Sequence, residues 1–225
     1  MSHPLDRAVW AALTTRQSDL ALGDGRARRL APAYGLFAAA ADASDENLRA
    51  LADLVHAHGE AALFEADPPT DLPGVTVTPG DAVSQMVAEA PVLQTPDFPV
   101  VRLGDADAAE MLALASLTKP GPFFARTHHL GDFIGVRMDG RLAAMAGERL
   151  KLPGYTEVSA VCTHPDFRGR GYAAGLMSLV TAGILARGET PFLHAYDHNE
   201  SAIRLYEALG WRRRRAVQVR FLTAG

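Results

Sequence analysis

A short turn with two glycines and two arginines lies between a strand-like segment at residues 155–163 and an apolar helical pattern. The turn holds Arg168, Gly169, Arg170 and Gly171. The first amides of a helix have no helical acceptor and the helix dipole favours negative charge there, so such a turn can bind a phosphate. Glycines also let the backbone approach a bulky ligand closely, because they have no Cβ. The alternative interpretation is a surface turn with solvated arginines.

The chain from residue 98 onward shows a dense order of strand and helix patterns. The expected elements are a strand at 98–103, a helix at 105–117, strands at 132–138, 141–150 and 155–163, a helix at 172–188, a strand at 190–197, a helix at 199–210 and a strand at 216–222. In an extended segment Glu157, Ser159, Val161 and Thr163 share one face. Because that face mixes polar with apolar side chains, we expect it to border a cleft.

The first part of the chain also mixes strands and helices. Its expected elements are strands at 33–40, 61–67 and 75–78 and helices at 44–58 and 80–90. Prolines at 91, 96 and 99 then interrupt regular structure. We therefore expect an N-terminal mixed α/β region at 1–90, a proline-rich linker at 91–97 and a second domain at 98–225.

Composition narrows the function classes. A chain of 225 residues with 48% apolar residues can bury a sizeable core, and its net charge of −4 gives no basic field for nucleic acid. No run of about 18 apolar residues predicts a membrane span, and the first residues lack signal-peptide features, so we expect no membrane partner and a cytoplasmic location. The single cysteine, Cys162, is expected in the core. The histidine spacings predict no metal site.

Two motifs in this order carry a resemblance to a known family. The segment RGRGYA at 168–173 resembles the Q/R-x-x-G-x-G/A motif of the GNAT superfamily of acyl-CoA-dependent N-acyltransferases. The segment NESAIRLYEALGW at 199–211 resembles the family's N-x-x-A-x-x-L-Y-x-x-L-G-F signature, with Trp211 in place of Phe. The resemblance covers about 98–222 and implies a mixed, mostly antiparallel sheet flanked by helices. For the first part of the chain, a degenerate copy of the same fold is one interpretation.

The resemblance implies acetyl-CoA as the acyl donor and names the residues that would bind it. Backbone amides around Gly169, Gly171 and Ala173 would hold its pyrophosphate, and the strand at Val161 and Thr163 would pair with its pantetheine arm. The full set of cofactor-binding candidates is Val161, Thr163, Arg168, Gly169, Arg170, Gly171, Tyr172, Ala173, Asn199 and Tyr206. For Asn199, a plain helix N-cap is an equal alternative.

The same resemblance implies catalytic roles. Tyr206 matches the tyrosine that gives a proton to the departing thiolate, the alternative being an aromatic residue that packs on a helix face. The amide of Val161 would stabilise the oxyanion of the thioester carbonyl. Glu157, eleven positions before Arg168, resembles the base of some histone-modifying members, and Glu148 is the alternative.

The expected function is acetyl transfer from acetyl-CoA to a primary amine of a small molecule, by direct attack in a ternary complex. A noncatalytic acyl-CoA-binding sensor is the alternative, and a nucleotide binder is disfavoured because no Gly-Lys-Ser/Thr loop is present. His128 and His129 lie in a segment that often lines the acceptor pocket in this family, although an exposed loop is the simpler interpretation. A homodimer is possible, and the sequence does not identify the acceptor.

Overall fold

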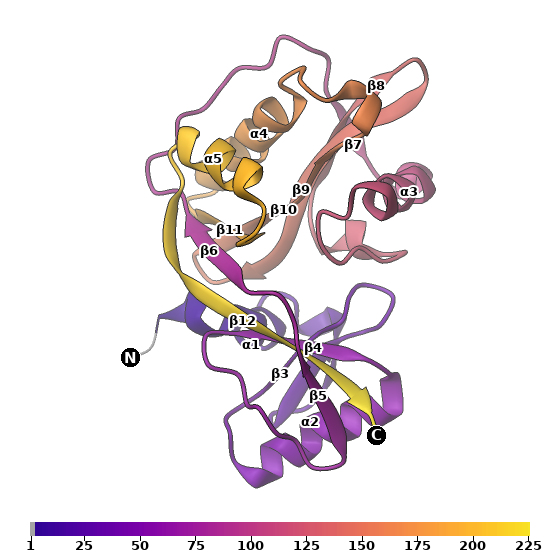
Figure 1. The fold of residues 1–225 in the computed structure, drawn as a ribbon, viewed down its shortest axis with the longest axis vertical. Coiled ribbons are helices and arrows are strands. Elements are labelled where there is room, and N and C mark those ends of the chain that lie inside the picture. The colour runs from indigo at the N-terminus through magenta and orange to yellow at the C-terminus, as the bar shows by residue number, and fades with distance from the viewer. Residues whose placement is uncertain (1–2) are drawn as a thin grey trace.

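The computed structural model describes residues 3–225 and places all its named strands in one continuous sheet (Figure 1). The strands are β1 (Ala21–Gly23), β2 (Ala27–Leu30), β3 (Phe37–Ala40), β4 (Ala61–Glu65), β5 (Val75–Pro79), β6 (Val83–Val87), β7 (Val101–Leu103), β8 (Phe133–Met138), β9 (Arg141–Leu152), β10 (Tyr155–Thr163), β11 (Thr190–Tyr196) and β12 (Arg212–Ala224). The α-helices are α1 (Ala8–Leu13), α2 (Asp45–His58), α3 (Ala108–Thr118), α4 (Tyr172–Ala186) and α5 (Glu200–Ala208).

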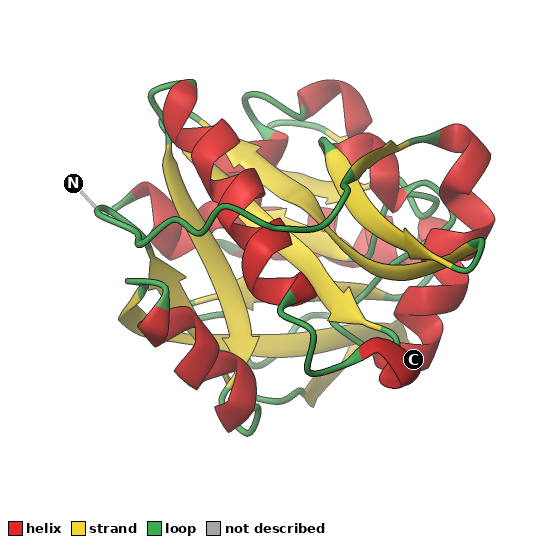
Figure 2. Ribbon diagram, turned by 90° about the horizontal axis from the view of Figure 1, so that it is seen from above, coloured by secondary structure: helices red, strands yellow, loops and turns green. Residues whose placement is uncertain are grey.

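The sheet is mixed and mostly antiparallel, with helices against it, which confirms the predicted fold class (Figure 2). Its strand order is β1-β2-β3-β4-β12-β6-β11-β10-β9-β8-β7, and β5 pairs with β12. Within the described chain, only the pairs β3/β4 and β10/β11 are parallel, and each is joined by a helix, α2 or α4. A helix is the usual crossover between parallel strands.

Two similar halves exchange strands across the middle of this sheet. In each half, antiparallel strands lead to a parallel pair, which is β3/β4 in the first half and β10/β11 in the second. The second strand of each pair then pairs antiparallel with a strand from the other half of the sequence. That strand is β12 beside β4 and β6 beside β11. Figure 1 shows β12 passing from beside β6 and α5 toward β5 and α2 in the other half of the molecule. The hydrogen bonding therefore crosses the expected boundary between 1–90 and 98–225.

The segment 80–90 was predicted as a helix, and this prediction is wrong because Val83–Val87 forms strand β6. Its residues Val83 to Met86 are all buried between β11 and β12, so polar and apolar positions alike lie inside the protein. A short, two-sided buried strand has no alternation that distinguishes it from a helix.

The helices bury apolar faces against the sheet, and α3 and α4, which both contact β9 and β10, pack in separate clusters. Helix α4 places Leu176, Met177 and Ile184 in one cluster with Trp211, whereas Met111 of α3 packs in another, with Cys162. Cys162 is buried, and burial raises the pKa of its thiol to about 11. Among residues 3–225, none of the helices combines the length and apolar composition needed to cross a membrane.

Candidate active site

One groove is lined by all ten residues that the resemblance marks as cofactor-binding. It lies between the end of β10, the turn before α4, the start of α4 and helix α5. Its empty volume is about 1230 Å³, including the part open to solvent. We call it the main groove; its other lining residues are Thr118, Lys119, Pro120, Cys162, Phe167, Ala174, Ser201, Ala202 and Leu205.

The turn before α4 has the geometry of an anion site. Gly169 and Gly171 have φ of 76° and 75°, a region that residues with a Cβ rarely adopt. Gly171 is the N-cap of α4 and has no side-chain hydrogen bond to offer. Within the described chain, the amides of residues 169–173 donate to no protein acceptor, while the amide of Gly175 bonds back to Gly171. These amides and the helix dipole fit a phosphate group.

The side chain of Tyr172 contributes differently from the rest of this turn. It is buried, with its ring centroid 4.9 Å from that of Phe98 in an edge-on contact. The tyrosine thereby anchors the start of α4 to the segment before β7. Any contact of Tyr172 with a ligand in the groove would therefore involve mainly its backbone.

A bulge in β10 interrupts the sheet beside the groove. Ser159 pairs with Gly147 and Cys162 with Met145, so two residues of β10 lie opposite one residue of β9. One of them, Ala160, has φ of 53°, an uncommon value for a residue with a Cβ. Bulges of this kind turn backbone groups away from the regular ladder. Val161, the next residue, lines the main groove.

Strands β10 and β11 separate just before this bulge. They are paired only from Tyr155 to Glu157 on β10, and β11 continues beside β6 instead. Beyond Glu157 this edge of β10 has no strand partner in the described chain, and the pairing of Val161 and Thr163 with a pantetheine arm, which the resemblance implies, would use it.

Helix α5 supplies the other wall of the groove. Asn199 accepts a hydrogen bond from the Ala202 amide at 3.2 Å, so it is the N-cap of α5, and it also lines the groove. Tyr206 lines the same groove, and burial, together with the nearby Cys162, raises the pKa of its phenol to about 12. The Tyr206 hydroxyl is therefore protonated at neutral pH.

Glu157 does not line the groove but lies fully buried in an ion pair. Arg149 donates from Nε to Oε2 at 2.8 Å and from Nη2 to Oε1 at 2.7 Å, and His194 Nδ1 lies 2.8 Å from Oε1. Burial by itself would raise the pKa of Glu157, but the charge of Arg149 and these hydrogen bonds lower it to about 2. The expectation that Glu157 is the base has no support from this geometry.

The alternative base, Glu148, is also paired. It is buried, with Arg187 Nη2 2.6 Å from Oε1 and Lys151 Nζ 2.8 Å from Oε2. Both carboxylates predicted as bases thus hold the sheet together through ion pairs, and neither lines the main groove.

His194 is a residue of this network that the sequence did not single out. The Gln85 amide nitrogen donates to the Leu5 carbonyl at 2.9 Å and lies 3.0 Å from His194 Nε2, while Gln85 Oε1 accepts from Arg214 at 2.7 Å. Because these partners fix the amide orientation, His194 Nε2 accepts and Nδ1 donates to Glu157. Burial lowers the pKa of His194, so the ring is neutral.

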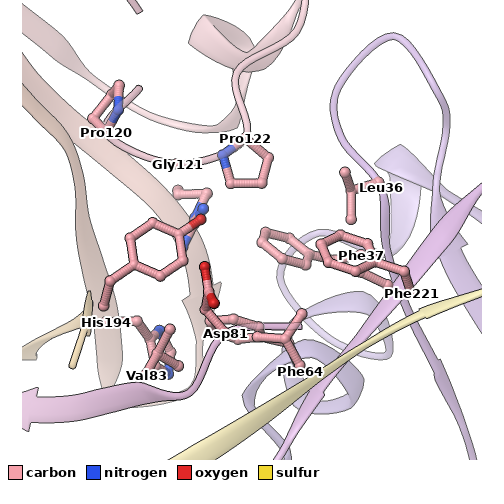
Figure 3. Close-up of a pocket in the computed structure, with 14 residues that line it drawn as sticks. Leu36, Phe37, Phe64, Asp81, Val83, Pro120, Gly121, Pro122, His194 and Phe221 are labelled. Atoms are coloured by element: carbon pink, nitrogen blue, oxygen red, sulfur yellow. The ribbon is translucent and has the colours of Figure 1, made fainter. Parts of the chain in front are cut away.

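A second cavity lies on the other side of β11, and we call it the aromatic pocket (Figure 3). Its empty volume is about 580 Å³, including the part open to solvent, and its lining residues are Leu36, Phe37, Ala62, Phe64, Asp81, Val83, Pro120, Gly121, Pro122, Arg149, His194, Tyr196, Val219 and Phe221. Pro120 also lines the main groove, and a third cavity, with an empty volume of about 640 Å³ including the part open to solvent, touches Lys119 and Tyr196 between the two sites. The two sites are thus neighbours across the segment that follows α3.

His128 and His129, weighed above as acceptor-site residues, line neither cavity. Their Nε2 atoms each lie 2.9 Å from Oδ1 of Asp105. The ligand atoms of these three side chains lie within 4.8 Å of one another, a grouping capable of holding a metal ion that the spacing of the histidines did not reveal. The His128 side chain is 6% exposed, whereas His129 and Asp105 are exposed.

Comparisons with known proteins agree with this architecture. The family model described as FR47-like protein matches residues 133–220. A GNAT-family protein from Novosphingobium aromaticivorans DSM 12444 has 48% sequence identity over 100% of both chains, with a TM-score of 0.90. No curated protein matches the chain.

More distant solved structures share the fold. A GCN5-related N-acetyltransferase from Kribbella flavida is 19% identical over 97% of this chain and 95% of its own, with a TM-score of 0.60. A tandem GNAT protein from the clavulanic acid biosynthesis pathway is 16% identical over 84% of this chain and 76% of its own, with a TM-score of 0.54. On the full-length 48% identity and the two motifs of its groove, the chain belongs to the GNAT family of acetyltransferases.

Proposed function

We propose that the protein transfers the acetyl group of acetyl-CoA to a primary amine of a small molecule held in the aromatic pocket. The observation that carries this proposal is that all ten cofactor-binding candidates line one groove, next to a second cavity. Acetyl-CoA supplies an activated thioester, and the protein supplies binding, orientation and proton transfer.

The main groove fits the donor at its anionic end. The amides of residues 169–173 and the guanidinium groups of Arg168 and Arg170 offer hydrogen bonds and positive charge to a pyrophosphate. The free edge of β10 at Val161 and Thr163 offers backbone partners to an extended arm.

In the reaction the bound ammonium first loses a proton to solvent, and the neutral amine nitrogen attacks the thioester carbonyl. A C–N bond forms, the C–S bond breaks, and the second proton that the nitrogen loses replaces the one that Tyr206 gives to the sulfur. The Val161 amide donates a hydrogen bond to the oxygen that gains charge, and Tyr206 gives a proton to the leaving sulfur. Because the pKa of Tyr206 is raised to about 12, the phenol carries its proton throughout the neutral range. No covalent bond to the protein is required.

The experiment incubates the purified protein with isotopically labelled acetyl-CoA and a metabolite extract, and identifies labelled products by mass spectrometry. We expect a labelled amide that depends on the protein. A matched pair of variants tests the groove: Ala173→Glu places a carboxylate at the anion site, and Ala186→Glu places one at the far end of the same helix. Product should be lost only with Ala173→Glu.

Saturable binding of acetyl-CoA without any labelled product would contradict acetyl transfer and favour the noncatalytic sensor. Binding of ATP in preference to CoA would contradict both and favour a nucleotide site.

A further inference from the structure

We propose that the aromatic pocket selects an amine with a single positive charge and an apolar, aromatic body, and that Asp81 binds the ammonium group of this acceptor. The inference rests on the proposed function and names the acceptor class of the same site.

The walls of the pocket favour an apolar body. Phe37 and Phe64 have ring centroids 5.3 Å apart, and Phe221 from β12 lies on the same side of the pocket (Figure 3). Leu36, Val83, Val219 and the prolines 120 and 122 complete an apolar lining. Transfer of an aromatic or aliphatic body from water into such a lining is favourable in proportion to the apolar area buried.

Among the described residues that line the aromatic pocket, the main groove and the third cavity between them, Asp81 is the only acidic one. Its side chain points into the pocket, between His194 and Phe64 (Figure 3). Within the described chain Asp81 is in none of the ion pairs, whereas both carboxylates predicted as bases are paired.

The other polar groups of the pocket leave it with a net negative charge. Arg149 lines the pocket, but its charge is offset by the two hydrogen bonds to Glu157. His194 is neutral because burial lowers its pKa. The unpaired charge that faces the pocket is therefore that of Asp81, which complements an ammonium group.

The strand register places Asp81 just beyond the end of β11. Tyr196, the last residue of β11, is opposite Val83 on antiparallel β6, so Asp81 lies two residues beyond Tyr196. Tyr196 lines the aromatic pocket and also the cavity that reaches Lys119 of the main groove, so this end of the pocket is the one next to the main groove.

The backbone on both sides of Asp81 is held in place. The Gly80 amide donates to the Val219 carbonyl at 3.0 Å, and the Asp197 amide donates to the Ala82 carbonyl at 3.1 Å. These bonds fix the backbone that carries Asp81, while its exposed side chain makes no hydrogen bond within residues 3–225 and so is available to an ammonium group.

This arrangement disfavours two other classes of amine. An amino acid would bring a carboxylate toward Asp81, and like charges repel. A polyamine would bury a second ammonium group among the phenylalanine rings, where no second carboxylate is present, and burying an unpaired charge is costly.

The experiment compares phenethylamine, phenylalanine and spermidine as acceptors of acetyl-CoA, with amide formation measured by mass spectrometry. The first two differ only by a carboxylate, so their comparison isolates the effect of that charge. We expect kcat/KM for phenethylamine to be at least about tenfold higher than for the other two, which corresponds to about 1.4 kcal/mol.

Variants of Asp81 test its role. Asp81→Asn should raise the KM for phenethylamine at least about tenfold and leave the Kd of acetyl-CoA within about twofold, and Asp81→Glu should restore part of the loss. Asp71→Asn, at an exposed site that does not line either cavity, is the matched control and should leave both constants unchanged.

A higher kcat/KM for phenylalanine or spermidine, or an unchanged KM in Asp81→Asn, would overturn the inference while acetyl transfer stands. Faster turnover with phenylacetyl-CoA and a small amine than with acetyl-CoA and phenethylamine would show that the pocket binds the acyl chain, and would also overturn it. If no amine in the panel or in the metabolite extract is acetylated, the proposed function itself fails.

Discussion

Arg149 of β9 and Glu157 of β10 form a buried ion pair with two parallel hydrogen bonds, 2.8 Å and 2.7 Å long, beside the aromatic pocket that Arg149 lines. The Glu157 side chain is fully buried and that of Arg149 is 9% exposed. Removing one member of such a pair leaves the other charged and buried without its partner, which is more costly than losing the pair as a whole.

Glu157→Gln should lower the free energy of unfolding by about 3 to 5 kcal/mol, because the guanidinium of Arg149 stays buried beside a neutral amide. Urea unfolding followed by circular dichroism measures this loss. Glu200→Gln is the matched control, since Glu200 pairs with Arg204 on the surface, where both side chains are more than two-thirds exposed. The control should unfold at the wild-type urea concentration; equal midpoints for both variants and wild type would contradict the account of the buried pair.

The low pKa of Glu157 makes the free energy of unfolding depend on pH. The pKa of Glu157 is about 2 in the folded protein against an ordinary value of 4.5, so its ionised form stabilises the fold above pH 4.5 and this contribution is lost as the pH falls toward 2. The difference corresponds to about 3 kcal/mol. Between pH 5 and about pH 2, the free energy of unfolding of the wild type should therefore fall by about 3 kcal/mol more than that of Glu157→Gln. Parallel curves for the two proteins in that range would rule out an ionised Glu157.

The cofactor-binding candidates that line the main groove could be predicted from the sequence, whereas the residues that line the aromatic pocket could not. The motif at 168–173 leads into α4, and the motif at 199–211 contains α5. Because α4 follows β10 and α5 follows β11, the residues of both motifs meet at one groove. Local patterns are sufficient where a strand, a turn and a helix adjoin.

The aromatic pocket was not predictable in this way, because its walls come from distant parts of the chain. Phe37, Asp81 and Phe221 meet only because β6 and β12 cross between the halves. The long β12 also begins four residues before the predicted strand, with a register shift between Arg213 and Arg215.

The charge partners of Arg213, Arg214 and Arg215 at the start of β12 also come from distant parts of the sequence. Arg214 and Arg215 both pair with Asp6, at 2.6 Å and 2.9 Å, and Arg213 pairs with Asp197. In the sequence the run resembles an exposed basic patch, whereas its partners are brought to it by tertiary structure.

Gly171→Ala should weaken acetyl-CoA binding and the fold together. An alanine at φ of 75° costs about 1 to 2 kcal/mol, and the loop can relieve this strain only by turning its amides away from the anion site. We expect the Kd of acetyl-CoA, measured by calorimetry, to rise at least about tenfold. Gly25→Ala, in an exposed turn without a positive φ, is the control and should bind like the wild type. Wild-type affinity in Gly171→Ala would contradict the role of this loop.

Tyr206→Phe should lower kcat by about 100-fold or more and leave the Kd of acetyl-CoA within about twofold, because the lost hydroxyl is needed by the leaving thiolate rather than by bound acetyl-CoA. Since burial raises the pKa of Tyr206 to about 12, its ionisation should not reduce wild-type kcat between pH 7 and about pH 10. Steady-state kinetics across this range check both expectations. Tyr155→Phe is the control, since among residues 3–225 the Tyr155 hydroxyl approaches His3. Equal kcat in Tyr206→Phe and wild type would remove the tyrosine from the reaction.

The most direct measurement of the central claim follows CoA thiol release and amide formation together in one reaction of the purified protein, labelled acetyl-CoA and an accepted amine. Direct transfer predicts one thiol for each amide, no release faster than the amine-dependent rate, and no label on the protein in intact-mass spectra. Thiol release without amide, or a labelled protein that passes its acetyl group to the amine, would contradict direct transfer from the main groove to the aromatic pocket.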